Sequence, residues 1–261
     1  MEILASIKNL TFSYGKGKNI LIDVSAVIQK GASITLLGPN GVGKSTLLNC
    51  ITGLLKVRQN TITLKGDDIT RMKIRGIAQV IAYVPQVIEK NFDYTVEEYV
   101  IMGRTAYKSL LSYPNKNDYT IVVEALKKMD IEHLAKCSFN EISGGEQQQV
   151  CIARALAQEP ELIILDEPTS ALDLDNQIKV LNLSKQITSL GYAVLMTTHN
   201  PEHSLLLNST VWILDRDGKM KVGTADDLIS EKTLRGLYTS KICVSNVPSI
   251  ERKVCVVDKL Q

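Results

Sequence analysis

The clearest chemical pattern in the sequence lies in residues 38–46, which read GPNGVGKST. They match the motif G-x-x-x-x-G-K-[ST], in which the backbone N–H groups of a glycine loop and of a helix start cradle phosphates. We expect Lys44 to reach the β- and γ-phosphates and the Ser45 hydroxyl to contact Mg²⁺. The motif therefore predicts a site for a nucleoside triphosphate. The residues expected to form it are Gly38, Pro39, Asn40, Gly41, Val42, Gly43, Lys44, Ser45 and Thr46.

A pair of carboxylates, Asp166 and Glu167, directly follows the apolar run 162–165. If that run is a strand parallel to the one before the phosphate loop, its carboxyl end delivers both acids close to Ser45. We expect Asp166 to hold Mg²⁺ and Glu167 to act as the general base, a role worth about 10²–10⁴ in rate. Acids after a strand are, by themselves, usually solvated loop residues, and only the phosphate loop favours the catalytic interpretation.

The segment Ser143-Gly144-Gly145-Glu146 opens a helical pattern and has two interpretations. As local structure it is a capping box, in which a serine and a glutamate three residues later satisfy the first N–H groups of a helix. As a binding element, its two glycines leave N–H groups at a helix start exposed to a second anion. The two interpretations are compatible.

These residues need elements that position them. Residues 33–37 read as a short buried strand, and residues 44–55 as the helix after the loop. The run 80–84 suits a strand covered on both faces, as in a parallel sheet. Further buried strands are predicted at residues 162–165, 193–198 and 211–214.

The chain before the phosphate loop alternates apolar and polar residues at 3–12 and 20–29. Because the connections between these segments and onward to residues 33–37 are too short for a crossover, we expect the three early strands to be antiparallel.

Residues 91–159 change to a helical pattern, with Thr95 as a helix cap, a loop at 113–117 and a helix at 118–129. The fold class expected is α/β: a P-loop NTPase core with a mostly parallel sheet, an N-terminal antiparallel β part and an inserted helical subdomain. The main domain spans residues 1–238, and residues 239–261 form a short tail with strand-like pieces.

The bulk composition excludes several classes of protein. The chain has 261 residues, 44% of them hydrophobic, and a net charge of +2 that gives no support for a nucleic-acid partner. No apolar run approaches the ~20 residues of a membrane span, and no secretory signal is visible. The five cysteines show no CxxC spacing and predict free thiols. Pairing of Cys243 with Cys255 across a terminal hairpin is the less favoured alternative.

Residues 142–147, ISGGEQ, resemble the signature motif of ABC-family ATPases, and they lie shortly before the Asp166-Glu167 strand as in that family. Four other landmarks of the family stand in the expected order along the chain, two before this motif and two after it. Tyr14 matches the aromatic residue that stacks on adenine, and Gln86 the glutamine that touches Mg²⁺ and water. Asp173 belongs to the loop that crosses to a second subunit, and His199 matches the histidine that senses the γ-phosphate.

The resemblance covers residues 3–238 and implies that ATP and Mg²⁺ are bound. It implies that Glu167, His199, Gln86 and Lys44 are catalytic, and that Ser45, Gln86 and Asp166 hold the metal. Two small departures, Ile142 for leucine and the lack of an arginine in residues 147–149, affect only the signature helix.

In this family the complete site needs two subunits. The resemblance thus implies a homodimer, or a pair with a similar chain, in which Tyr14 and the phosphate loop of one copy face Ser143, Gly144, Gly145, Glu146 and Asp173 of the other. It also implies two transmembrane permease subunits, an indirect link to an extracytoplasmic solute-binding protein, and a peripheral location at the cytoplasmic face of the plasma membrane.

The substrate is the least determined property. Residues 92–104 resemble ATPases that serve importers of iron chelates, haem and cobalamin, mainly by their Thr-Val…Gly-Arg spacing. Thr105 and Ala106 stand where that group often has proline, and molybdate or tungstate import stays open. A soluble ABC protein acting on ribosomes or DNA, or a non-hydrolysing ATP-binding module, fits the motifs less well.

Overall fold

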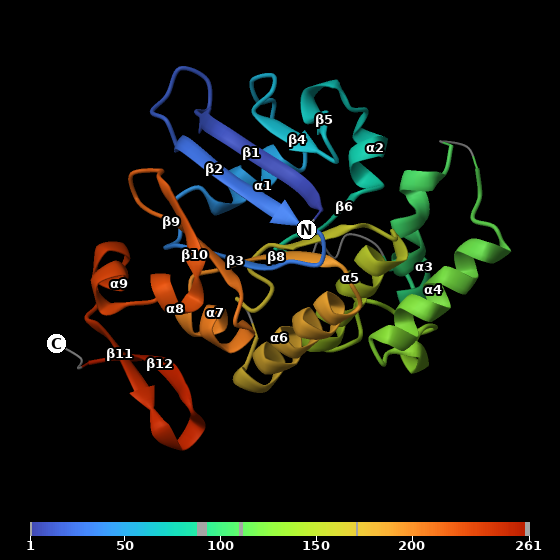
Figure 1. Cartoon of the computed structure of the whole chain (residues 1–261). Coiled ribbons are helices and arrows are strands. Elements are labelled where there is room, and N and C mark those ends of the chain that lie inside the picture. Colours follow the sequence, from blue (N-terminus) through green and yellow to red (C-terminus); the bar gives the residue numbers. More distant parts are fainter. Residues whose placement is uncertain (1, 88–92, 110–111, 171, 259–261) are drawn as a thin grey trace.

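The computed structural model describes residues 2–87, 93–109, 112–170 and 172–258, and it is built around a six-stranded sheet (Figure 1). The strand order is β10-β9-β3-β8-β7-β6, and all neighbours are parallel except β10 and β9. The strands are β3 (Ser33–Leu37), β6 (Ile81–Val84), β7 (Leu162–Leu165), β8 (Ala193–Thr198), β9 (Thr210–Leu214) and β10 (Met220–Thr224). The predicted parallel sheet is confirmed, because its near-continuous apolar strands are buried on both faces.

Strand β7 shows how the two faces are used. Leu162 and Ile164 point into a core shared with the N-terminal sheet and the helix α1, while Ile163 and Leu165 point into a second core shared with α5 and α6. This alternation is the ordinary period of two of a strand.

The N-terminal sheet has the order β2-β1-β4-β5 and is antiparallel throughout. Its strands are β1 (Ile3–Phe12), β2 (Leu21–Gln29), β4 (Ile62–Leu64) and β5 (Asp67–Asp68). The expectation that the third strand would also be antiparallel here is wrong: β3 joins the central sheet, parallel to β8 and β9. The reason lies in burial, because β2 alternates buried and exposed residues whereas β3 is buried at four of its five positions and needs cover on both sides.

Helix α1 (Lys44–Ile51) follows the phosphate loop and ends earlier than the expected residue 55. Thr52 caps it, and Gly53 adopts a φ of +72°, the left-handed conformation that commonly stops a helix. Leu54 consequently lies outside the helix with 61% of its surface exposed.

Three helices form most of the segment between β6 and β7: α3 (Val96–Ile101), α4 (Lys116–Lys128) and α5 (Gly144–Ala157), with 3₁₀ turns η2 (Met102–Tyr107) and η3 (Glu132–Leu134). Thr95 caps α3 as predicted, in a reciprocal box with Glu98. Helix α4 starts before the expected residue 118, because Asn115 and Asp118 form a capping box. Helix α5 packs on both α3 and α4, and its C-terminal half approaches the central sheet at β6 (Figure 1).

The remaining elements complete the layers around the sheet. They are η1 (Ile69–Arg71), α2 (Ile74–Ala78), α6 (Leu174–Ser189), α7 (Pro201–Leu207), α8 (Ala225–Leu228) and α9 (Glu231–Leu237). No helix of the described segments has both the length and the apolarity that crossing a bilayer requires.

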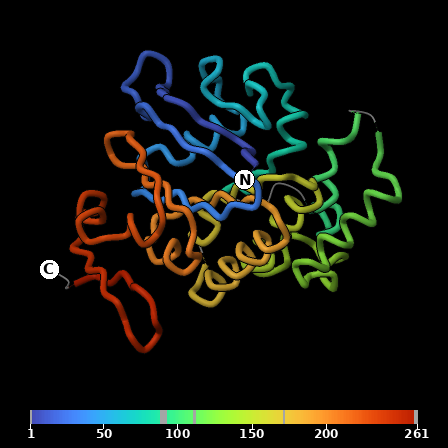
Figure 2. The backbone as a smooth tube through the Cα atoms, in the orientation of Figure 1, coloured from blue at the N-terminus to red at the C-terminus, as the bar shows by residue number. Residues whose placement is uncertain are grey.

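The chain ends in a hairpin of β11 (Ile242–Val247), the 3₁₀ turn η4 (Pro248–Ile250) and β12 (Arg252–Val257). The backbone trace places it beside α7 and α9, away from α3 and α4 (Figure 2). Val244 lies directly opposite Cys255, so Cys255 shares the face of Val244 and Cys243 faces the other way. Both thiols are free, and this geometry explains why the two cysteines do not pair.

Candidate nucleotide site

The phosphate loop connects β3 to α1 and has a backbone that only glycine accommodates at key points. Gly41 and Gly43 have φ angles of +80° and +107°, and a Cβ on Gly43 would lie 2.6 Å from Cγ2 of Ile20. A Cβ on Gly38 would lie 2.5 Å from the carbonyl oxygen of Leu214. Gly43 is the N-cap of α1 and provides no side-chain cap, which suits a helix start that receives an anion.

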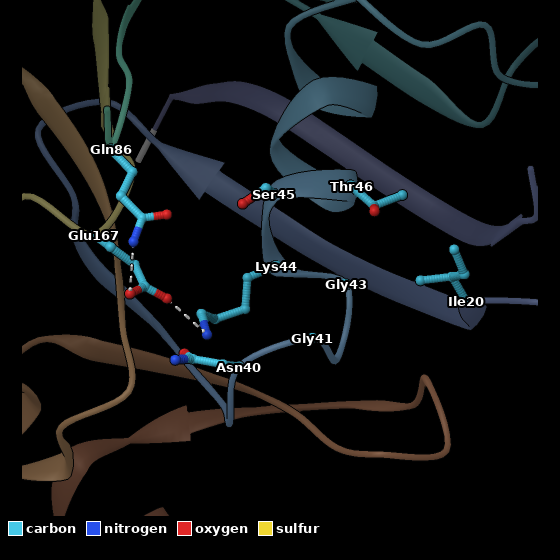
Figure 3. Close-up of a pocket in the computed structure, with 9 residues that line it drawn as sticks. All are labelled: Ile20, Asn40, Gly41, Gly43, Lys44, Ser45, Thr46, Gln86 and Glu167. Atoms are coloured by element: carbon cyan, nitrogen blue, oxygen red, sulfur yellow. Dashed lines mark hydrogen bonds and ion pairs between the residues drawn. The ribbon is translucent and has the colours of Figure 1, made fainter. Parts of the chain in front are cut away.

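A cavity of about 380 Å³ opens over this loop (Figure 3). Its volume lies in the usual range for small-molecule sites, roughly 300–1,000 Å³. The lining residues are Ile20, Asn40, Gly41, Gly43, Lys44, Ser45, Thr46, Gln86 and Glu167.

Lys44 reaches across the inside of the loop. Its Nζ donates to the carbonyl oxygens of Gly38 and Pro39 at 2.9 and 3.0 Å and lies 3.0 Å from Oε1 of Glu167. The two charged side chains point toward each other at one side of the cavity (Figure 3). Only 5% of Lys44 is exposed, and a buried ammonium is tolerable because carbonyls and a carboxylate surround it. A γ-phosphate bound here would compete with Glu167 for this cation.

Asp166 is buried immediately behind the cavity and does not line it. Its Oδ1 accepts a hydrogen bond from Thr197 Oγ1 at 2.7 Å, and its Oδ2 accepts one from the Tyr83 hydroxyl at 2.9 Å. Burial, and next the charge of Asp166, raise the pKa of Tyr83, so the phenol stays a donor. A carboxylate has about four lone-pair positions, so Asp166 keeps acceptor capacity beyond these two bonds.

Glu167 turns away from β7 in a left-handed conformation, with a φ of +44°. Such a φ is uncommon for a residue other than glycine, and it aims the carboxylate into the cavity. The backbone N–H of Glu167 donates to Thr197 Oγ1 at 2.7 Å. One threonine hydroxyl on β8 therefore holds both acids, because it also donates to Asp166.

Thr197 was missed in the sequence. The signal that could have revealed it is a polar pair, Thr197 and Thr198, at the end of the otherwise apolar strand β8, which lies next to β7.

Gln86 follows the end of β6 and His199 follows the end of β8, and both side chains contact the Glu167 carboxylate. Nε2 of Gln86 lies 3.5 Å, and Nδ1 of His199 lies 3.3 Å, from Oε2 of Glu167. Gln86 lines the cavity, whereas His199 stands at its margin with a half-exposed side chain. Four residues predicted from separate parts of the sequence, Lys44, Gln86, Glu167 and His199, thus come together.

Tyr14 lies near Thr46, away from the Lys44–Glu167 pair, and is 54% exposed. Its hydroxyl is 3.4 Å from Oγ1 of Thr46, and its ring stands edge-on to Phe12 with a centroid distance of 5.2 Å. Tyr14 does not line the cavity, but the contact with Thr46 places it next to the start of α1.

The signature segment, residues 143–146, forms the start of α5, and Asp173 precedes α6. None of these residues lines the cavity. Ser143 and Glu146 form the expected capping box at the start of α5, and their hydrogen bonds lower the pKa of the Glu146 carboxyl. Asp173 caps α6 by accepting from the N–H of Asn176 at 2.9 Å. A Cβ on Gly144 would meet nothing within 4 Å, whereas one on Gly145 would lie 2.7 Å from Oδ1 of Asn176, so this helix start is open at Gly144.

The Gly103-Arg104 pair of the segment that suggested chelate import has a packing role. A Cβ on Gly103 would lie 2.3 Å from the carbonyl oxygen of Arg154, so the turn fits directly against α5. The buried Arg104 binds Asp118, the Ala157 carbonyl oxygen and Glu159. Phe92 of the same segment lies outside the described residues.

Comparison with known proteins adds an independent finding. A family model described as "ABC transporter" matches residues 21–170. An uncharacterized ABC transporter ATP-binding protein of Haemophilus influenzae is 35% identical over 90% of this chain and 89% of its own length. The molybdate import ATP-binding protein MolC of the same organism is 34% identical over 91% and 89%.

The iron(3+)-hydroxamate import ATP-binding protein FhuC of Bacillus subtilis is 32% identical over 96% of this chain and 93% of its own. Among solved structures, an inward-facing ABC transporter described as of the metal-chelate type matches with a TM-score of 0.88 and 31% identity, over 99% of this chain and 98% of that one.

Proposed function

The chain belongs to the ABC transporter family as an ATP-binding, ATP-hydrolysing domain, and from this premise we propose that it energises an importer of metal chelates. Relatives named for iron chelatin and iron hydroxamate transport, and the fold match to a metal-chelate type transporter over 99% of the chain, support this substrate class. MolC supports molybdate as the second candidate at a similar identity of 34%.

The observation that carries the catalytic assignment is the convergence of three side chains on Glu167. In the proposed reaction the Glu167 carboxylate accepts a proton from the attacking water, and Lys44 leaves it to bind the β- and γ-phosphates. Gln86 and His199, within 3.5 Å of Glu167, orient the water and the γ-phosphate.

The donor set next to the loop fits Mg²⁺. Ser45 offers a hydroxyl, Gln86 an amide oxygen and Asp166 a carboxylate, and oxygen ligands of this kind are those that Mg²⁺ prefers. When bound, Mg²⁺ would neutralise charge on the phosphates. Asp166 would act from behind the cavity, where Thr197 and Tyr83 hold it in place.

The signature half of the site is proposed to come from a second copy. None of Ser143, Gly144, Gly145, Glu146 and Asp173 lines this chain's own cavity, and the start of α5, open at Gly144, offers N–H groups to an anion. ATP held between two positive helix starts would close the dimer, and hydrolysis would release it.

ABC ATPase subunits of importers work with membrane-spanning permeases. We propose that the dimer binds two permease subunits at the cytoplasmic face of the plasma membrane, as a peripheral protein. A solute-binding protein on the other side would act on it indirectly.

The test of the substrate class is purification of the chain with the permease that it binds, followed by reconstitution in vesicles with the matching solute-binding protein. We expect a ferric hydroxamate to stimulate ATP hydrolysis and to enter the vesicles, and molybdate to do neither. Stimulation by molybdate alone would reject the chelate proposal in favour of the second candidate.

A further inference from the structure

His199 has little around its own side chain to hold it. It lies between β8 and α7, its imidazole is half exposed, and its contact among the described residues is with Glu167 at 3.3 Å. The direction of the imidazole therefore depends on the backbone of residues 199 and 200. The N–H of the peptide between His199 and Asn200 donates to Thr198 Oγ1 at 3.0 Å.

The carbonyl of His199 is held from a distant part of the chain. The Tyr238 hydroxyl donates to this oxygen at 2.7 Å, across 39 residues of sequence. Tyr238 is the C-cap of α9, and its ring packs against the core formed by β9, α8 and α9. Burial raises the pKa of Tyr238, with Cys255 and Glu167 adding to the shift, so the phenol remains protonated and able to donate at neutral pH.

The terminal hairpin holds the helix that follows His199. Glu202, in the first turn of α7, pairs with Arg252 and accepts a hydrogen bond from the N–H of Cys255 at 2.9 Å. The same hairpin reaches α9, because the N–H of Val244 donates to Glu231 at 3.3 Å. The segment from His199 to Glu202 is thus bonded to the C-terminal part of the chain at two points. One is the His199 carbonyl, bonded to Tyr238, and the other is Glu202, bonded to the hairpin.

We propose that Tyr238 is a positioning residue for His199, and that the C-terminal hairpin keeps the two elements in register. The proposal rests on the catalytic role of His199 proposed above. The tyrosine hydroxyl fixes the peptide plane after His199, and this plane sets the direction in which the imidazole meets Glu167 and the γ-phosphate. Tyr238 is not among the residues that line the cavity over the phosphate loop, so we expect nucleotide binding not to depend on this contact.

The test variant is Tyr238→Phe, which keeps the packed ring and removes the hydrogen bond. Because one hydrogen bond that positions His199 is lost, we expect kcat for ATP hydrolysis by the full chain to fall about 2- to 12-fold. The KM for ATP should stay unchanged. The matched control is Tyr192→Phe, at a half-buried tyrosine whose hydroxyl shows no hydrogen bond among the described residues, and it should leave kcat unchanged.

A cycle with His199→Ala separates this proposal from the one on which it rests. If Tyr238 acts through His199, Tyr238→Phe lowers kcat in the wild-type background and causes no further loss in His199→Ala. A further loss there, or wild-type kcat in Tyr238→Phe while His199→Ala is impaired, would overturn the positioning role and leave His199 in place. Normal turnover of His199→Ala would instead reject the role of His199 itself.

A purely structural role of Tyr238 predicts a different combination of stability and kcat. It predicts that Tyr238→Phe lowers the thermal midpoint while kcat at a temperature well below that midpoint is normal. Thermal melts of both tyrosine variants and kcat on the same preparations distinguish the two accounts.

Discussion

The two proposed halves of the ATP site are built in opposite ways. Around the phosphate loop, Lys44 and Glu167 are buried and form an ion pair, and Thr197 holds the Asp166 carboxylate and the backbone N–H of Glu167. At the start of α5, Ser143 and Glu146 form reciprocal hydrogen bonds of a capping box at the surface, and Gly144 beside Ser143 has open space around it. The first half is assembled inside one chain, and the second is a capped helix end that would meet the nucleotide of the other copy in the proposed dimer. In the proposed dimer, one chain therefore supplies the charged groups of the reaction and needs its partner to cover the nucleotide.

The largest expected effect comes from Glu167→Gln. Without a carboxylate to accept the proton of the attacking water, we expect turnover to fall at least about 10²-fold. ATP should still bind and should hold two copies together, because hydrolysis no longer opens the dimer. Turnover by phosphate release and size by light scattering with ATP are the measurements. Wild-type turnover by Glu167→Gln would show that Glu167 is not the base, and that the charged groups around the phosphate loop do not carry out the reaction as proposed.

Mixing two inactive variants tests whether the halves come from different copies. Lys44→Ala damages the phosphate loop, and Gly144→Asp places a negative charge at the open start of α5, where no atom lies within 4 Å of a new Cβ. Each variant alone should be inactive. A mixed dimer contains one site with both halves intact, so mixing should restore activity.

The control for Gly144→Asp is Gly76→Asp on α2, a helical glycine with only Met72 Cε at 4.0 Å from a new Cβ. It should leave hydrolysis unchanged. If the mixture of Lys44→Ala and Gly144→Asp stays as inactive as its components, the split site is contradicted.

A smaller effect is expected from Thr197→Val, which removes the hydroxyl shared by the two acids. The buried N–H of Glu167 then loses its acceptor, at a cost of about 1–3 kcal/mol in the free energy of unfolding. We expect kcat to fall as well, because the Asp166 carboxylate and the backbone of Glu167 each lose a positioning bond. Thr197→Ser keeps the hydroxyl and should retain most of both. Denaturant unfolding and ATPase assays compare the two variants. Equal kcat values in Thr197→Val and Thr197→Ser would show that the Thr197 hydroxyl has only a structural role.

The smallest effect concerns the C-terminal hairpin. Because Cys243 and Cys255 lie on opposite faces, a mild oxidant should form no disulfide between them, and a reductant should not shift the thermal midpoint. Mass spectrometry of peptides after alkylation checks this. A Cys243–Cys255 linkage would mean that the hairpin register is different.

Much of the fold could be predicted from local pattern. The alternating strands β1 and β2, the buried runs of β6, β7 and β8, and the caps Thr95 and Ser143 all follow from short stretches of residues. Patterns failed where a neighbour in space decides. The placement of β3 depends on which sheet can cover it, and the end of α1 depends on a left-handed glycine.

The sequence by itself determined the phosphate loop, the acid pair and the order of the family motifs, because each depends on residue types at fixed spacing. It could not show that Thr197 holds both acids or that Tyr238 holds His199, because those bonds join residues 30, 31 and 39 positions apart. Only the tertiary structure decided them: hydrogen bonds act over about 3 Å, and the distance between two side chains depends on how the strands and helices pack.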